Sequence, residues 1–176
     1  MARELGDHCY NIPSESIYGE ITANSIMKLC SGIVFAREIT ILDIGSGSGY
    51  TLCNLAKAFP KNKCNLIGIE VSTIRAELSR TIIPKIIPPN VNRWDIIEKD
   101  ILKLKNLSKI DLCFSFDKTF TKDLMKHIID LQMDSCFYVI SCHSYEEKNW
   151  IEMKRVPCRL RGSGQIITFF VYIKKI

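Results

Sequence analysis

Residues 41–49 read ILDIGSGSG, an apolar stretch that runs directly into alternating glycines. The residues ILDI have the character of a buried β-strand, and the glycines that follow favour a tight turn. Residues 50–59 continue in a helical pattern, and a second apolar strand over residues 65–69 is followed by Glu70. The order strand, glycine turn, helix, strand and acid predicts a nucleotide-type pocket at the carboxyl edge of a parallel sheet.

In the rest of the chain, strands alternate with helices, and a β-hairpin follows this alternation. The expected elements share apolar periodicity and turn residues at their ends: helices over residues 23–30, 50–59, 73–83 and 121–131, and strands over residues 39–44, 65–69, 94–98, 110–116, 136–141, 154–160 and 165–173. Pro84 is expected to terminate the third helix, and residues 165–172 have the apolar run of a central buried strand. This order predicts an α/β fold in one domain over residues 1–176. Its sheet is Rossmann-like, mostly parallel and seven-stranded, with a C-terminal antiparallel β-hairpin.

Composition and charge exclude some classes of protein. Lys and Arg number 24 and Asp and Glu 19, giving a net charge of +5. That excess leans mildly toward acidic partners such as nucleic acid, and it equally suits ordinary solubility charge. No apolar stretch approaches the ~18 residues of a membrane helix, and the N-terminus lacks a signal core. We therefore expect a soluble intracellular protein, cytoplasmic or nuclear, with no membrane partner.

Eight cysteines occur without a CxxC pair, and several lie inside apolar runs. They are typical of small buried hydrophobic residues in a reducing compartment. The adjacent residues Cys142 and His143 suggest a metal ligand pair or a nucleophile. No partner ligand or base stands out in the sequence, so we interpret the pair as the end of a strand and expect no metal site.

The glycine turn narrows the choice of cofactor. A dinucleotide fingerprint, G-x-G-x-x-G counted from Gly45, would need a glycine where Tyr50 stands, and a P-loop would need a lysine after Gly49. Asp43 precedes the turn, where a carboxylate would repel a pyrophosphate. S-adenosyl-L-methionine (SAM) carries a sulfonium and an ammonium, with which an acid is compatible. Glu70 is placed to accept from ribose hydroxyls in SAM and NAD alike, and Asp100 could accept from an adenine amino group.

Residues 43–49 together with Glu70 resemble the first two motifs of class I SAM-dependent methyltransferases. Asp100 and Asp117 stand where the third and fourth motifs of that family lie, and the terminal hairpin matches the family's antiparallel last strands. The resemblance implies a set of cofactor-binding residues: Asp43, Gly45, Gly47, Gly49, Glu70, Asp100 and Ile101.

A second element, YGEIT at residues 18–22, is similar to one in the Dot1-type histone lysine methyltransferases. In that family a Y-G-E-x-T element precedes the SAM loop and closes over the cofactor. The likeness implies that residues 1–20 form an N-terminal arm and a cofactor-covering loop. It also implies that Tyr18, Glu20 and Thr22 line the methionine end of SAM and a lysine channel. Small mitochondrial-type lysine methyltransferases are similar in the same turn and in residues 139–143.

Methyl transfer demands little of the side chains, because the sulfonium is already activated and the enzyme mainly aligns the acceptor. A lysine acceptor, whose ordinary pKa is about 10.4, must lose a proton, and an apolar aromatic channel favours the neutral amine. Tyr18 and Phe116 are the aromatic candidates for the catalytic site, and Asp117 is the candidate polar guide. We expect a protein-lysine methyltransferase, and the likeness to the Dot1 type implies a histone as its substrate.

Two alternatives stay open. The first is an RNA methyltransferase, which the positive charge favours, and the second is a SAM-fold subunit that binds a partner without catalysis. Residues 115–118, SFDK, differ from the Asn-rich segment of the Dot1 family and lack the paired prolines of amino-base methyltransferases.

Overall fold

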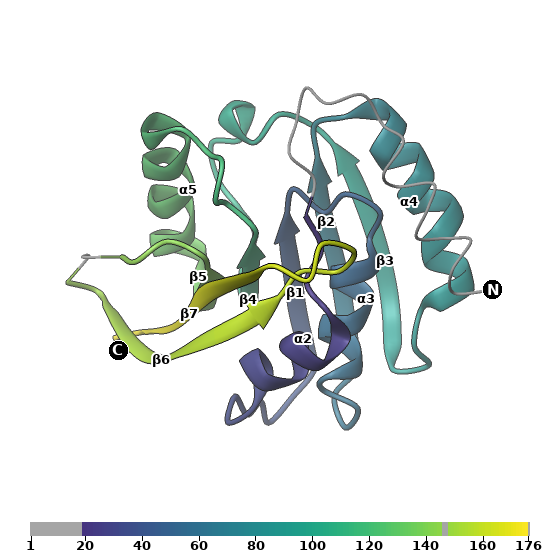
Figure 1. The fold of residues 1–176 in the computed structure, drawn as a ribbon, viewed down its shortest axis with the longest axis horizontal. Helices are drawn as coiled ribbons and strands as arrows, with labels where there is room; N and C mark the ends of the chain where they lie inside the picture. Colours follow the sequence, from purple (N-terminus) through teal and green to yellow (C-terminus); the bar gives the residue numbers. More distant parts are fainter. Residues whose placement is uncertain (1–18, 146–147, 176) are drawn as a thin grey trace.

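The computed structural model describes residues 19–145 and 148–175, which form a seven-stranded sheet with helices on both faces (Figure 1). Its strands run in the chain order β1 (Ile39–Ile44), β2 (Cys64–Glu70), β3 (Val91–Glu98), β4 (Ile110–Ser115), β5 (Cys136–Ser141), β6 (Trp150–Arg159) and β7 (Ile166–Lys174). Its helices are α2 (Ala23–Cys30), α3 (Tyr50–Lys57), α4 (Thr73–Ile86), the 3₁₀ helix η1 (Ile101–Lys103) and α5 (Lys122–Ser135). The predicted α/β fold, with its mostly parallel sheet and terminal antiparallel hairpin, is confirmed.

The strands lie in the order β3-β2-β1-β4-β5-β7-β6. β1 is the switch point of the sheet, because the chain proceeds from it first to β2 and β3 on one side and then to β4 and β5 on the other. Ile44, the last residue of β1, pairs in register with Ile69 of β2 and Ser115 of β4. The carboxyl ends of the three strands therefore meet at one edge, where open α/β sheets bind their ligands.

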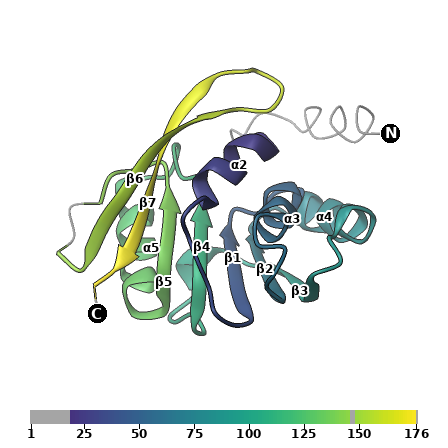
Figure 2. The same ribbon diagram turned by 90° about the horizontal axis from the view of Figure 1, so that it is seen from below.

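Helices flank the sheet (Figure 2), and an apolar core lies on each of its two faces. Ile39 and Ile41 of β1 pack into the core that includes α2, α3 and α4, whereas Leu42 and Ile44 pack into the core that includes α5. Burial on both faces explains why the sequence of β1 is apolar almost throughout. Within the described residues, none of the helices combines the length and the apolar character that crossing a membrane requires.

The closing hairpin inserts β7 between β5 and β6, antiparallel to both. The expectation of a central strand is correct, but the expectation of continuous burial is wrong. Side chains in the first half of β7 alternate between exposed and buried, with Ile166 61% exposed, whereas Val171 and Tyr172 are both buried. The reason is that strands flank β7 on both edges while one face of its first half lies open.

Pro84 lies inside α4, so the prediction that it ends the helix is wrong. A proline removes a single N–H donor from the helix ladder, and here the loss falls in the last turn. Ile83 is fully buried and Ile86 packs against the same core. The N–H of Ile87 donates to the carbonyl of Ile83 at 2.9 Å, which closes the final turn.

Candidate functional site

The glycine turn, residues 45–49, is held against the end of β2. The N–H groups of Gly45 and Ser46 both donate to the carbonyl of Ile69, at 2.8 and 3.1 Å. Gly49 begins α3 with φ of 78°, and a Cβ there would lie 2.6 Å from Cγ1 of Ile83. Only glycine therefore fits at the point where the turn passes α4, and this close approach aims the start of α3 at the sheet edge.

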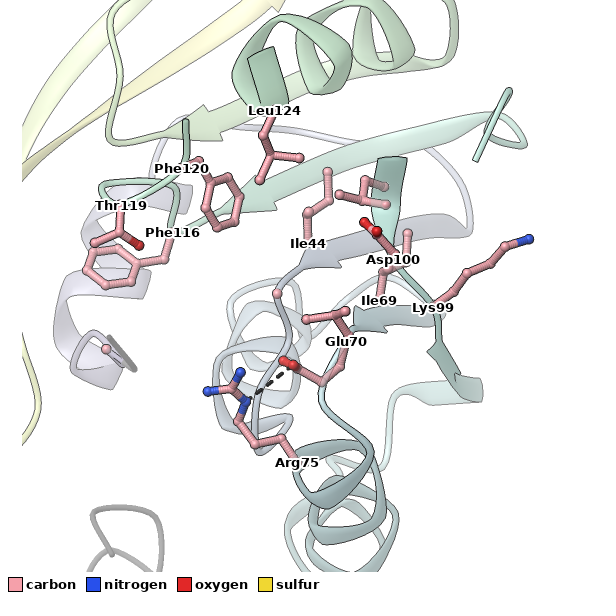
Figure 3. Close-up of a pocket in the computed structure, with 14 residues that line it drawn as sticks. Ile44, Ile69, Glu70, Arg75, Lys99, Asp100, Phe116, Thr119, Phe120 and Leu124 are labelled. Atoms are coloured by element: carbon pink, nitrogen blue, oxygen red, sulfur yellow. Dashed lines mark hydrogen bonds and ion pairs between the residues drawn. The ribbon is translucent and has the colours of Figure 1, made fainter. Parts of the chain in front are cut away.

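Glu70, at the end of β2, is buried and ties three segments together. Its Oε2 accepts from the N–H of Gly47 at 2.9 Å, and its Oε1 accepts from the N–H of Ser72 at 2.9 Å. Nε of Arg75 lies 3.2 Å from the same Oε1 (Figure 3). The acid predicted to meet a ribose thus also fixes the glycine turn and the start of α4.

Three buried carboxylates surround the glycine turn, those of Glu20, Asp43 and Glu70. The pKa of Asp43 is raised well above its ordinary value of 3.8, first because the carboxyl is buried and then because Glu70 and Glu20 add negative charge nearby. A cationic ligand would relieve this repulsion, whereas a phosphate would increase it. The electrostatics of the turn therefore fit the sulfonium and ammonium of the predicted cofactor.

A large cavity of about 250 Å³ opens at this edge of the sheet (Figure 3). Its wall is mainly apolar and carries the carboxylates of Glu70, at the end of β2, and Asp100, just after β3. The other lining residues include Ile44, Ile69, Ile101, Phe116, Phe120 and Leu124. Asp100 also caps η1, since its Oδ1 accepts from the N–H of Leu102 at 3.0 Å. The arrangement suits a nucleoside, with an apolar slot for the base and acids for its polar groups.

A small cavity continues from the large one and shares Gly19, Gly45 and Phe116 with it. Its wall adds two acids and two hydroxyls: Glu20, Asp43, Ser46 and Thr51. The Oγ atom of Ser46 is buried and has no hydrogen-bond partner within residues 19–145 and 148–175. Acids for an ammonium beside hydroxyls for a carboxylate suit the amino-acid end of a ligand.

The cover segment, residues 19–22, lies between the glycine turn and the closing hairpin. Its backbone joins the hairpin, because the N–H of Thr22 donates to the carbonyl of Arg159 at 3.0 Å and the N–H of Arg161 donates to the carbonyl of Glu20 at 2.7 Å. The carboxylate of Glu20 accepts from Oγ of Ser48 in the turn and from Nη1 of Arg161, the latter at 3.0 Å. Glu20 therefore links residues 19–22 to both the glycine turn and the closing hairpin.

Phe116 and Asp117 directly follow β4, but their side chains have different surroundings. Phe116 lines both cavities, and its ring stacks on Phe169 with centroids 5.7 Å apart. Asp117 is fully buried and lines neither of the two; it accepts from Oγ of Ser141 at 2.5 Å and from the N–H of Cys142 at 3.0 Å. Nδ1 of His143 lies 3.1 Å from its Oδ1, and this hydrogen bond raises the pKa of His143.

The family model for the histone methylation protein DOT1 matches residues 2–155 of this chain. The chain belongs to the DOT1 family. The prediction of a class I SAM-dependent methyltransferase, with SAM as its cofactor, is confirmed by this match together with the fold. No curated protein matches the sequence.

Solved structures share the fold of this DOT1-family chain at low sequence identity. Magnesium protoporphyrin IX methyltransferase from Synechocystis PCC 6803 with bound SAH has a TM-score of 0.68 and 11% identity, over 99% of this chain and 94% of that chain. A putative O-methyltransferase from Klebsiella pneumoniae has a TM-score of 0.67 and 14% identity, over 98% and 87%. A putative RNA methyltransferase from Pyrococcus horikoshii has a TM-score of 0.62 and 12% identity, over 99% and 98%. These similarities show the fold and leave the acceptor open.

Most of the cofactor-binding residues predicted for this DOT1-family chain meet at one sheet edge. Glu20, Asp43, Gly45, Glu70, Asp100 and Ile101 line the two cavities, while Gly47 contacts Glu70 and Gly49 shapes the turn. Thr22 lines neither cavity; its hydroxyl caps α2 by accepting from the N–H of Ser25 at 3.3 Å. Tyr18 lies outside the described residues. The role of each remains a prediction.

Sequence reasoning missed several residues of the DOT1-family site. Arg75, five residues after Glu70 and in the first turn of α4, carried a detectable signal, because a helix start after an acid brings the two side chains together. Phe120, Leu124, Ser46 and Thr51 also line the cavities. The first two carried no local signal, because only the sheet topology places the segment after β4 beside β1 and β2.

Proposed function

We propose that this chain transfers a methyl group from SAM to a lysine side chain of a protein. The observation that carries the proposal is the position of Phe116 at the junction of the two cavities. An aromatic ring there, between a nucleoside slot and an acid-lined hollow, borders the place where a reactive methyl group would be presented.

The large cavity would hold the adenosine part of the cofactor. Asp100 and the apolar residue Ile101 would face the adenine, and Glu70 would accept from the ribose hydroxyls. A carboxylate oxygen can accept more than one hydrogen bond, so Glu70 can do this without releasing Gly47. The apolar walls formed by Ile69 and Leu124 would pack against the base.

The ammonium end of the methionine part would reach into the small cavity, whose volume of about 10 Å³ admits one small group. Glu20 and Asp43 would face the ammonium, and the hydroxyl of Ser46, which has no partner among the described residues, would donate to the carboxylate. SAM supplies an activated methyl group on a sulfonium. Arg75 and Arg161 already pair with Glu70 and Glu20, and the net positive charge of the methionine end would offset the remaining negative charge around the turn.

The acceptor would enter beside Phe116. The apolar ring disfavours the ammonium form of a lysine, so the neutral amine is the form that reaches the methyl group. Stacking on Phe169 holds the ring, and Gly19 lies so close to it that a Cβ at that position would overlap the ring. Tyr18, which precedes Gly19 in the sequence, is proposed to complete the aromatic wall, and Asp117 acts at most through its neighbours. Membership of the DOT1 family favours a histone among protein substrates.

The test is a transfer assay with tritiated SAM against core histones, total cell protein and RNA. We expect label on lysine in protein, with histones labelled first. Phe116→Ala should lower turnover by at least roughly tenfold while calorimetry shows SAM still bound. Leu102→Ala, an exposed apolar residue on η1, is the matched control and should leave both values unchanged.

Other outcomes separate the alternatives. Label in RNA alone would replace the lysine proposal with an RNA methyltransferase. SAM binding without transfer to any of the three acceptors would favour the non-catalytic subunit. Failure to bind SAM would overturn the placement of the cofactor.

A further inference from the structure

Asp117, Cys142 and His143 form a cluster of three different donor atoms. The cluster lies where β4 and β5 end, and the pairing of Ser115 with Ser141 brings these ends side by side. Sγ of Cys142 lies 2.8 Å and Nδ1 of His143 lies 3.1 Å from Oδ1 of Asp117. All three donor atoms lie within 4.8 Å of one another.

The carboxylate of Asp117 is held in place by groups that would not have to leave if a metal ion bound. Oγ of Ser141 donates to Oδ2 at 2.5 Å, and the N–H of Cys142 donates to Oδ1 at 3.0 Å. The N–H of His143 in turn donates to Oγ of Ser141 at 2.9 Å. Outer hydrogen bonds of this kind orient the ligands of metal sites.

Burial gives the cluster an inner and an outer side. Asp117 is fully buried, whereas the side chain of His143 is 39% exposed. An ion can therefore approach from the side of His143 and meet a fixed carboxylate behind it. Neither Cys142 nor His143 lines the large or the small cavity, so the cluster is separate from the proposed cofactor site.

We propose that Asp117, Cys142 and His143 bind a divalent ion of the zinc class. One thiolate, one imidazole and one carboxylate are a set that zinc accepts, while calcium and magnesium favour oxygen ligands alone. Three protein ligands leave one position open, as in zinc sites that bind a further molecule. Coordination replaces the thiol S–H bond with an S–metal bond and releases one proton to solvent.

The proposal reverses the interpretation of Cys142 and His143 as an ordinary strand end. From the sequence the pair lacked a third ligand, because Asp117 stands 25 residues before Cys142. Only the parallel pairing of β4 with β5 brings the carboxylate to them. The inference does not depend on the identity of the methyl acceptor.

Cobalt(II) is the probe, because it occupies zinc sites and reports its ligands in the absorption spectrum. We expect one equivalent of Co²⁺ to give a thiolate-to-cobalt charge-transfer band that excess Zn²⁺ abolishes. Cys142→Ser should remove the band, and His143→Gln should weaken binding. Ser141→Ala should weaken it roughly 10- to 100-fold, as expected for an outer partner. Calorimetry with SAM verifies that each variant is folded.

The matched control is the double change His8→Gln with Cys9→Ser, which removes the chain's other sequence of adjacent histidine and cysteine. This variant should keep the band and the affinity. The proposal is overturned if the wild-type protein gives no thiolate band, if the band survives in Cys142→Ser, or if it disappears in the control.

Discussion

Glu70 accepts a hydrogen bond from the backbone N–H of Gly47 at 2.9 Å, across 23 residues of chain. One side chain thus both shapes the glycine turn and faces the large cavity. Its loss would leave the buried N–H of Gly47 and the half-buried N–H of Ser72 without this acceptor, and Arg75 without this buried ion-pair partner.

Glu70→Ala is therefore expected to abolish SAM binding and to lower the free energy of unfolding by about 1–3 kcal/mol. Glu98 is a matched control, because it is likewise the last residue of a strand but is exposed, with a loose ion pair to Arg80 and an exposed hydrogen bond from Oγ1 of Thr73 at 2.6 Å. Glu98→Ala should cost less than about 1 kcal/mol and leave SAM binding intact. Urea unfolding and calorimetry measure both effects; SAM affinity retained by Glu70→Ala would contradict the placement of the ribose.

Asp43→Asn is expected to stabilise the ligand-free protein as the pH rises. Because the pKa of Asp43 is raised in the folded state, its contribution to stability is present below its ordinary value of 3.8 and is lost as the pH rises through the raised value. The asparagine cannot ionise, so the variant should match the wild type at low pH and exceed it near neutrality.

Thermal unfolding of both proteins between about pH 4 and pH 8 tests this, with and without SAM. The variant should also lose the stabilisation that SAM gives the wild type, since the carboxylate facing the ammonium is gone. Asp95→Asn, at an exposed position on β3, controls for a change of net charge. A stability difference that shrinks as the pH rises would show that the fold does not raise the pKa of Asp43.

Arg161→Ala is expected to weaken SAM binding by roughly tenfold and to lower the free energy of unfolding by about 1–3 kcal/mol, because the buried carboxylate of Glu20 loses a charged partner. Nη1 of Arg161 holds the carboxylate of Glu20 at 3.0 Å, and its guanidinium lies 4.2 Å from the ring centroid of Tyr50. Without it, the cover segment keeps its backbone bonds but loses a side-chain anchor. Arg155→Ala, which breaks an exposed pair with Glu152, should leave SAM affinity unchanged in the same calorimetric titration.

Gly49→Ala is expected to destabilise the fold more than Gly32→Ala does. Both glycines have left-handed φ, 78° and 83°, so both changes carry a similar backbone strain of about 1 kcal/mol. Only at Gly49 would the new Cβ meet a neighbour, Ile83, whereas nothing lies within 4 Å at Gly32. The difference in urea midpoint isolates the close packing of α3 on α4, and adding Ile83→Ala should recover part of it. Equal effects at both positions would mean that Ile83 and α4 shift to accommodate the new Cβ at little cost in free energy.

The sequence predicted those parts of the fold whose physical cause is local. The bounds of β1, β5 and α2 agree with the predicted ranges, because burial on both faces gives long apolar runs and Thr22 is a recognisable cap. The continuation of α4 through Pro84 was not predictable in this way. Packing of Ile86, which follows the proline, against the core favours the continuation, and a local helix-breaking rule does not take such packing into account.

The residues of the candidate site also differ in whether their positions have a local cause or depend on the tertiary structure. The glycine turn, Glu70 and Asp100 follow from their places at or just after strand ends, so the sequence predicts that they meet at the edge that lines the cavities, as the structure shows. Thr22 was expected to line the site because it belongs to the YGEIT element, yet the capping of α2 takes up its hydroxyl. The contacts of Asp117 with Cys142 depend on strand order, which brings together residues far apart in the chain.

The insertion of β7 between β5 and β6 has a consequence for synthesis on the ribosome. β6 leaves the exit tunnel before β7, yet it cannot join the sheet until β7 has filled the place beside β5. The cover segment is bonded to Arg159 and Arg161 of the same hairpin. Residues 19–22 are therefore synthesised early but are held in place only after the hairpin has been synthesised. A nascent chain stalled before residue 166 would therefore expose the glycine turn without its cover, and cofactor binding would begin only after the hairpin has docked.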